Sequence, residues 1–532
     1  MSSTTRALIS LAICLTFGLL MLPGCATVEE ERRPPNIILF LVDDMGWQDT
    51  SVAFHSEKTP FNDHFRTPNM ERIASTGILF TQAYAAPVCS PTRTSIMTGQ
   101  SPVRHHVTNW TLFPDRDQSG ETERLKAPRD WRKEGLQADD LTLPKLLQDQ
   151  GYFTIHSGKA HWGAHGTSGN DPTNLGFDVN IAGHAAGAPG HYHGEENYGN
   201  EGSGEYTPPW GVPGLEKYHG TTTHLTDSLT TEACQAIETA AGRNQPFYLY
   251  MAHYAVHTPI QEHRPYVDHY RETKYEGTGI EIPEVEAKYA SMVEGMDASL
   301  GRILEKVDEL GLAEETIVLF GSDNGGLSAH ARGTTPMGTE AETHNWPLKA
   351  GKGSAYEGGT RVPMIVSWVR AQPNNAIQKS IPIEAASKSS EPTISEDFFP
   401  TICRLAGVEI PTEYEGSVDG IDLVDAISGD ETSLSERALL FHYPHVWGPK
   451  GLGYEPHSSI RVGDWKAIYF YEPQRWELYD VSGDIGEKND LAGEYPDRLS
   501  QLAGEMRTLH ERLGAQYPQN KSTGEEEPPK WP

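Results

Sequence analysis

Six consecutive apolar residues, Ile37 to Val42, are followed at once by the acidic pair Asp43-Asp44. A strand that is apolar on both faces must be covered on both sides, as central strands of parallel sheets are. Further buried-strand patterns alternate with helical ones, at Pro246–Ala252, Thr316–Gly321 and Val362–Trp368. The chain is therefore expected to be an α/β protein with a mixed, mostly parallel sheet sandwiched by helices.

The pattern changes after residue 435. Short strands with turns between them precede a predicted helix over Pro496–Leu513, which indicates a smaller C-terminal subdomain with an antiparallel sheet and a helix, 436–515. The main domain is expected to span 36–435. The charged, Pro-rich tail 516–532 is expected to be disordered. Within the main domain, Gly163–Gly220 is rich in Gly, Pro and His and has little periodicity, which is typical of a binding loop.

The N-terminus has the composition of a signal peptide, 1–25, followed by a polar linker, 26–35. The apolar run from Ala7 to Leu22 is short for a membrane span. Leu22-Pro23-Gly24-Cys25 resembles a bacterial lipobox, in which Cys25 is lipidated; simple cleavage and release is the alternative, since proline is unusual there. The sequence thus predicts export to the periplasm, or anchoring in the outer membrane as a lipoprotein.

The net charge is −31, from 43 basic and 74 acidic residues. Nucleic-acid binding needs a basic surface, so this balance argues against it. An anionic substrate would need a site where positive charge or metal is concentrated locally. Two cysteines of the main domain, Cys234 and Cys403, either pair or stay free; their spacing does not decide.

Residues 89–99 read Cys-Ser-Pro-Thr-Arg-Thr-Ser-Ile-Met-Thr-Gly. Pro91 suits the first turn of a helix, so Cys89 is expected at a helix N-terminus, where unpaired N–H groups favour an anion or an activated nucleophile. Arg93 lies one turn further along, on the same side. A buried cysteine beside a surface arginine is the alternative interpretation.

Other polar residues follow predicted strands, where parallel sheets bind their ligands. Asp43, Asp44, Asp323 and Asn324 form an oxygen-only set that suits Ca²⁺ better than Zn²⁺, although either pair alone could cap a turn. Cationic and proton-transfer groups follow strands or lie among glycines, where backbone can approach an anion; they are Lys159, His161, His257 and Lys352.

Six motifs in this order resemble the type I sulfatases, which have an alkaline-phosphatase-like fold. They are strand-Asp-Asp, Cys-x-Pro-x-Arg, Gly-Lys-x-His, His-Thr-Pro, Ser-Asp-Asn-Gly, and Gly-Lys-Gly before Glu-Gly-Gly-x-Arg-Val-Pro. The likeness extends from about Asn36 to Pro363 and is strongest to bacterial carbohydrate sulfatases. It implies hydrolysis of sulfate esters, with Cys89 oxidised to formylglycine (3-oxoalanine) by a maturation enzyme.

The resemblance also implies a role for each motif residue. Ca²⁺ would be held by the four oxygen donors and by the modified Cys89. Arg93 and Lys159 would stabilise the formylglycine hydrate, which attacks sulfur, and Lys352 would neutralise the sulfate oxygens. His257 would protonate the leaving oxygen, and His161 would take the proton from the second hydroxyl.

The sequence indicates the substrate less directly than it indicates the reaction. The resemblance implies a sulfated polysaccharide or oligosaccharide, attacked from the chain end and carrying galactose or N-acetylgalactosamine sulfate. Candidate sugar contacts in Gly-rich and aromatic segments are His184, His224, His344, Trp346, His442 and Trp447. Two alternatives remain at this point: a phosphate or phosphonate monoester hydrolase of the same superfamily, and a non-catalytic glycan-binding surface lipoprotein.

Overall fold

The computed structural model describes residues 33–202, 209–338, 343–430, 434–447 and 452–532. The predicted signal peptide, its Cys25 and most of the predicted linker lie outside these residues. Pro34 to Pro532 form one compact unit. Within the described ranges, no helix is both long and apolar enough to cross a membrane.

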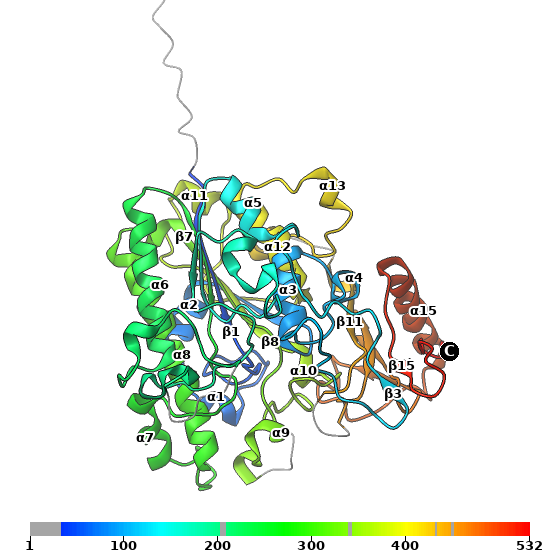
Figure 1. Ribbon diagram of the computed structural model, residues 1–532. Helices are drawn as coiled ribbons and strands as arrows, with labels where there is room; N and C mark the ends of the chain where they lie inside the picture. Colours follow the sequence, from blue (N-terminus) through cyan, green and yellow to red (C-terminus); the bar gives the residue numbers. More distant parts are fainter. Residues whose placement is uncertain (1–32, 203–208, 339–342, 431–433, 448–451) are drawn as a thin grey trace, which may run out of the picture. The chain divides into compact units, whose positions relative to one another are not determined.

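The main sheet has nine strands in the order β10-β2-β8-β7-β1-β6-β4-β5, with β9 beside β2 (Figure 1). Its pairings are parallel except those of β8, which is antiparallel to both β7 and β2. This confirms the expected mixed, mostly parallel sheet. The strands are β1 Asn36–Val42, β2 Ile78–Tyr84, β4 Phe153–Gly158, β5 Val179–Ile181, β6 Phe247–Ala252, β7 Thr316–Ser322, β8 Arg361–Trp368, β9 Ser387–Ser389 and β10 Thr393–Ile394.

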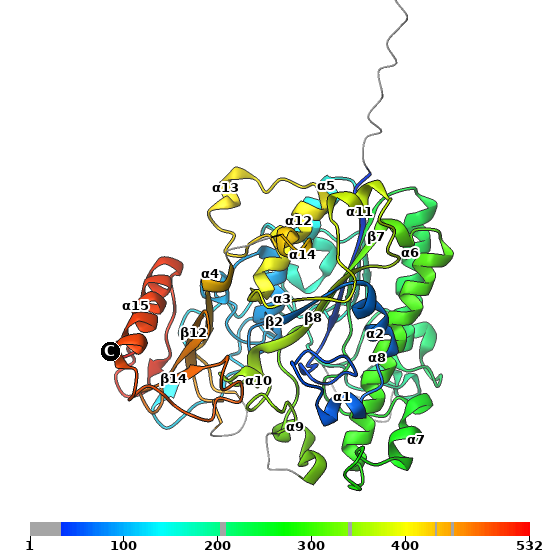
Figure 2. The same cartoon turned by 180° about the vertical axis from the view of Figure 1, so that it is seen from behind.

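Helices cover both faces of this sheet, as the apolar runs require (Figures 1 and 2). In β1, Ile38, Phe40 and Val42 pack on one face, and the alternate residues pack on the other. The helices on the first face are α2 Pro68–Thr76, α6 Leu225–Gly242, α7 Arg264–Glu272 and α8 Glu284–Glu309. Those on the second face are α3 Cys89–Thr98, α5 Leu143–Asp149, α12 Phe398–Ala406 and α14 Val424–Ile427.

The C-terminal part forms a separate antiparallel sheet in the order β11-β12-β13-β14, as expected. Its strands are β11 Ala438–Tyr443, β12 His457–Val462, β13 Trp465–Phe470 and β14 Arg475–Asp480, and α15 Pro496–Leu513 packs against it. Shorter helices are α1 Pro60–His64, α4 Pro102–His105, α9 Ala329–Arg332, α10 Glu357–Thr360, α11 Ala376–Ser380 and α13 Thr412–Glu415.

The expectation of a disordered tail is wrong. Strand β15, Gln519–Asn520, pairs with β3, Leu125–Lys126, and Trp531 packs into the core of the C-terminal sheet. The indole of Trp476 donates a hydrogen bond to the carbonyl of Lys530 at 2.8 Å. One aromatic anchor and a few backbone bonds thus order a segment whose composition alone favours disorder. Elsewhere, Cys234 and Cys403 are free thiols.

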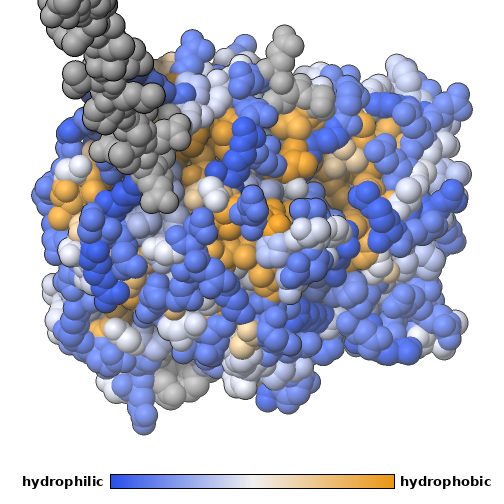
Figure 3. Space-filling view, turned by 90° about the horizontal axis from the view of Figure 1, so that it is seen from above, coloured by the Kyte–Doolittle hydropathy of each residue, from blue (hydrophilic) through white to orange (hydrophobic). Residues whose placement is uncertain are grey.

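Hydrophobic residues on the face seen in Figure 3 gather in patches that hydrophilic residues interrupt. Exposed large apolar side chains are few among the described residues; they are Ile280, Trp346, Leu452 and Tyr495. Single exposed apolar side chains are common on protein surfaces.

A buried carboxyl group makes the stability of this fold pH-dependent. Glu396 is 4% exposed, and burial, with Asp397 beside it, raises the pKa of Glu396 from 4.5 to about 8. Between these values the unfolded chain loses the proton more readily than the folded one. The free energy of unfolding should therefore fall as pH rises, by up to about 1.4 kcal/mol per pH unit, and level off above the folded pKa.

Glu396→Gln should flatten this decline, because the amide has no proton to lose. Urea unfolding at several pH values between about 5 and 8 measures it. The exposed Glu413, changed to Gln, is the matched control and should keep the wild-type slope. Parallel wild-type and Glu396→Gln curves would contradict the prediction.

Candidate active site

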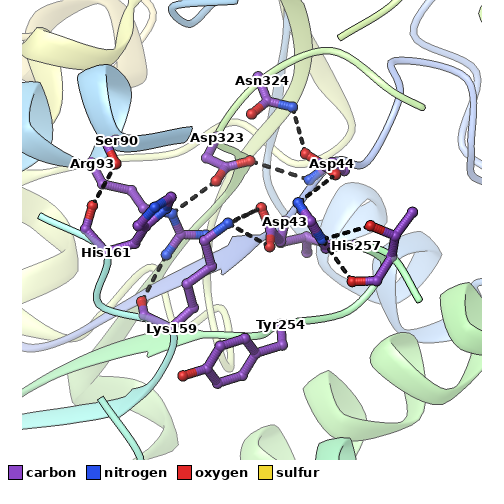
Figure 4. A network of polar contacts seen from close by, with 12 residues as sticks. Asp43, Asp44, Ser90, Arg93, Lys159, His161, Tyr254, His257, Asp323 and Asn324 are labelled. Carbon is purple, nitrogen blue, oxygen red and sulfur yellow. Dashed lines mark hydrogen bonds and ion pairs between the residues drawn. The ribbon is translucent and has the colours of Figure 1, made fainter. Parts of the chain in front are cut away.

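The register of the central strands brings the predicted acids together. β1 and β7 are parallel and end opposite each other, so Asp43 and Asp323 emerge side by side (Figure 4). β6 and β4 continue the same edge, and Lys159 follows β4 directly. Ligands of open parallel sheets bind at this edge.

Two buried ion pairs lie at this edge, and one of them reaches α3. The Lys159 ammonium lies 2.7 Å from both carboxylate oxygens of Asp43. Arg93, one turn into α3, donates from Nε to Asp323 at 2.8 Å and from Nη1 to the carbonyl of Lys159 at 2.8 Å. All four side chains are fully buried. Burial and the neighbouring Asp323 raise the pKa of Asp43 well above its usual value, so further positive charge at this point would stabilise its anion.

Asp44 lies at the centre of a second set of contacts. Lys352 approaches Oδ1 to 2.7 Å, Asn324 donates to the same oxygen at 2.8 Å, and His257 Nε2 lies 3.6 Å from Oδ2. Burial alone would raise the pKa of Asp44, but Lys352 and His257 outweigh burial and hold it below its ordinary value. The backbone N–H of Asp44 also donates to Asp323 at 3.2 Å, which joins the two sets.

Cys89 begins α3, as the sequence predicted, and it is 3% exposed. Its Sγ and carboxylate oxygens of Asp43 and Asp323 all lie within 4.8 Å of one another. Burial raises the pKa of the Cys89 thiol to about 11. An unmodified Cys89 is therefore protonated at neutral pH and is a poor nucleophile.

The two predicted histidines present different nitrogens. His257 Nδ1 lies 2.8 Å from the carbonyl of Thr258 and must donate to it, so Nε2 is free to take up a proton. His161 Nε2 donates to the carbonyl of Thr111 at 2.9 Å, and Nδ1 has no hydrogen-bond partner among the described residues. Burial, reinforced by Lys352, lowers the pKa of His257 to about 3; burial and Lys159 lower that of His161.

The donor set fits a hard divalent cation. Asp43, Asp44 and Asp323 supply oxygen, and the buried Asn324 Oδ1 has no hydrogen-bond partner among the described residues. Carboxylate and amide oxygens suit Ca²⁺, whereas the thiol of Cys89 is a soft donor that does not. An oxygen-bearing group at position 89 would complete the set.

A cavity of about 470 Å³ opens above these residues. Cys89, His161, His257 and Lys352 line it, together with three tryptophans and mostly small or apolar residues. The wall residues are Val88, Trp110, Gly187, Ala188, Trp210, Thr258, Leu327, His330, Ala331 and Trp447. Gly187 lies close against the His161 ring. A Cβ at this position would lie 2.2 Å from Cε1, so a side chain would displace the ring. The sequence singled out Trp447 and the loop that contains Trp210, but not Trp110 or His330, which no motif marks.

Five predicted sugar contacts do not line this cavity. The assignment is corrected for the four histidines among them, which are buried in packing contacts, whereas that of Trp346 stays a prediction. His224 caps α6 and stacks on His263, with ring centroids 4.1 Å apart. His442 is buried in β11 between Ser458 and the carbonyl of Gln516. The other three are His184, buried beside Tyr254, His344, buried 3.6 Å from Glu286, and Trp346, 45% exposed. Aromatic residues in loops serve packing as readily as recognition, and local sequence does not separate the two.

Comparison with known proteins agrees with this geometry. The family model described as Sulfatase matches residues 35–408, and that described as N-sulphoglucosamine sulphohydrolase, C-terminal, matches 349–516. The chain belongs to the sulfatase family and is a sulfuric ester hydrolase.

Similar proteins cover most of its length. A sulfatase of Formosa agariphila is 28% identical over 91% of this chain and 89% of its own. The N-acetylgalactosamine-6-sulfatase of Sus scrofa is 30% identical over 87% of this chain and 76% of its own. The crystal structure of Ps i-CgsB in complex with k-i-k-neocarrahexaose is 27% identical, has a TM-score of 0.68 and covers 90% of this chain and 94% of its own.

Removing one cation from the buried cluster should destabilise the fold. Lys159→Met leaves the Asp43 carboxylate without its nearest partner, and breaking a buried pair in this way costs about 3–5 kcal/mol. Urea unfolding in the presence of a chelator measures the loss. Lys488→Met, at an exposed lysine, is the control and should change stability by less than about 0.5 kcal/mol. If Lys159→Met were as stable as Lys488→Met, the charge of Lys159 would not be needed to neutralise Asp43.

Proposed function

We propose that the protein hydrolyses sulfate esters at the ends of a sulfated polysaccharide or oligosaccharide, using formylglycine made from Cys89 and a bound Ca²⁺. The observation that carries this proposal is one cavity whose lining combines three tryptophans with Lys352, His161 and His257. Aromatic rings pack against sugar faces, and the polar side chains suit a sulfate group. A cavity of about 470 Å³ lies within the usual size range of small-ligand sites.

The residues present fit both groups. Formylglycine at position 89 would supply a hydrated aldehyde as oxygen nucleophile, and Ca²⁺ would supply positive charge beside the sulfate. Asp43, Asp44, Asp323 and Asn324 would hold the ion. Burial raises the pKa of the unmodified Cys89 thiol to about 11, so the thiol is a poor nucleophile at neutral pH.

Lys352 and His257 line the cavity and would act on the sulfate ester itself. Lys352 offers a fixed positive charge to the sulfate oxygens as their charge grows. His257 is neutral in the free protein, but a bound anion beside it favours its protonated form. Its Nε2 proton would then pass to the leaving sugar oxygen.

His161 and Arg93 act at position 89. Because His161 Nε2 donates to a carbonyl, Nδ1 is the basic atom and would accept a proton there. Arg93 is held between Asp323 and the carbonyl of Lys159, which fixes its guanidinium beneath the start of α3. Galactose or N-acetylgalactosamine sulfate is the proposed sugar class.

The remaining parts of the proposal rest on sequence. The formylglycine would come from a separate maturation enzyme that recognises the Cys-x-Pro-x-Arg segment at Cys89. The segment before residue 33 supports export to the periplasm or the outer membrane, with Cys25 as the site of a lipid anchor.

Turnover of defined substrates tests the reaction. Protein with formylglycine confirmed by mass spectrometry should cleave sulfated galactose and N-acetylgalactosamine oligosaccharides, and should prefer an aryl sulfate to the matching aryl phosphate. Cys89→Ala should lose at least about a thousandfold in kcat/KM, since a nucleophile is removed. Faster phosphate turnover would favour the phosphate monoester hydrolase, and full activity of Cys89→Ala would favour a role without this chemistry.

Calcium should be required for both activity and stability. Removal of metal by a chelator should abolish sulfate release, and added Ca²⁺ should restore it and raise the melting temperature, because the ion binds only the folded chain. Asn324→Ala, which removes a neutral donor, should need a higher Ca²⁺ concentration for the same recovery. Recovery with Zn²⁺ but not with Ca²⁺ would contradict the oxygen-ligand assignment.

A further inference from the structure

A second cavity, of about 560 Å³, lies where the edge of the main sheet meets the C-terminal sheet. Its walls come from β2, β9 and the start of β8 on one side and from β12 and the segment after β14 on the other; Figure 2 shows β2, β8, β12 and β14 on this side. The lining residues are Trp47, Phe54, His55, Ser56, Thr81, Gln82, Arg361, Lys388, Ser389, Ser390, Arg461, Asp464, Val481, Ser482, Gly483 and Ile485.

The lining is positively charged although the chain is strongly acidic. Arg361, Arg461 and Lys388 face one carboxylate among the described lining residues, that of the exposed Asp464. The chain as a whole has a net charge of −31. A concave site that reverses the sign of its surroundings concentrates anions.

Arg461 has neutral partners. It is 3% exposed, its Nε donates to the carbonyl of Gly463 at 3.0 Å, and its other nitrogens donate to the Tyr84 hydroxyl and to Gln82 Oε1. None of the ion pairs found among the described residues involves Arg461. The Tyr84 hydroxyl donates in turn to Glu357 at 2.7 Å, so the nearest acid reaches Arg461 only through Tyr84. Glu357 also pairs with Arg361 and Lys466, and it therefore does not balance the charge of Arg461 alone.

Arg361 shares the carboxylate of Glu357 with Lys466. Its Nε and Nη2 donate to the carbonyl of Thr81, and its Nη1 lies 3.3 Å from Glu357, which pairs more closely with Lys466, at 2.9 Å. The guanidinium lies over the Trp47 ring, 4.4 Å from its centroid. A guanidinium has five N–H groups, and each of these two arginines makes three hydrogen bonds to the described protein, so N–H donors remain for a ligand.

We propose that this cavity binds a sulfate group through Arg361 and Arg461, with Lys388 at its rim. Guanidinium groups match the oxygens of tetrahedral oxyanions, and the hydroxyls of Ser389, Ser390 and Ser482 add polar surface. The choice of sulfate among oxyanions rests on the proposed function, whereas the cationic character of the cavity does not. The sulfate group is either the free ion released by catalysis or an ester on a further sugar of the substrate.

Selenate, which has the charge and shape of sulfate, locates the site directly. Crystals of the full chain soaked in selenate should show a selenium anomalous peak between Arg361 and Arg461, apart from any peak at Cys89. In solution, calorimetric titration with sulfate should detect this site, and Lys388→Glu should weaken it roughly tenfold. Lys388 is exposed, so this variant should fold normally; Lys379→Glu, at an exposed lysine away from the cavity, should bind as wild type.

Kinetics separates the two sources of sulfate. If a sulfated glycan occupies the cavity, Lys388→Glu should raise the KM for a sulfated oligosaccharide. The KM for an aryl sulfate should then stay unchanged. If the free ion is the ligand, both KM values stay unchanged and only the affinity for sulfate falls. No selenium peak at these arginines, with identical sulfate titrations of Lys388→Glu and wild type, would overturn the proposal. Selenate binding without any sulfatase activity would contradict the proposed function alone.

Discussion

Six buried charges at one edge of the sheet determine how this protein is built. Three carboxylates follow β1 and β7, and Arg93, Lys159 and Lys352 reach them from three different segments. An isolated buried carboxylate would be very costly, so each acid depends on a cation brought by tertiary structure. The central strands, α3 and the Gly-rich segment around Lys352 are therefore held in one arrangement by the same charges that form the site.

This arrangement also explains why the site suits an anion. The cations at its base neutralise carboxylates, and a further divalent ion would leave the site with net positive charge. Burial keeps the thiol of Cys89 protonated and both histidines neutral in the free protein. The acid–base groups therefore respond to the charge of a bound ligand more than to the pH of the solution.

The two cavities show how a chain with a net charge of −31 can recognise sulfate. In both, a few buried cations act at short range, while the acidic surface lies further away and is screened by salt. The cavities lie at opposite ends of the segment from Lys352 to Arg361, which contributes one cation to each. Net charge therefore predicts solubility and the exclusion of nucleic acid, and local charge predicts the ligand.

The sequence by itself determined the main strands and the acids that meet at one edge of the sheet. Apolar runs such as Ile37–Val42 identify buried strands, and the acids and Lys159 stand directly after them, so the edge on which they meet follows from chain order. These predictions rest on local sequence, because the residues that identify the end of a strand or the start of a helix lie within a few positions of it.

Only the tertiary structure decided which aromatic residues line the cavity, that the tail is ordered, and that Arg461 lies beside Arg361. His224 and His442 lie in segments whose sequence resembles that of a sugar-binding loop, but both pack inside the protein. Trp110 and His330 line the cavity although no sequence motif contains them. Such contacts join residues far apart in the chain. They depend on how side chains fill space between elements, and no pattern within one segment records that.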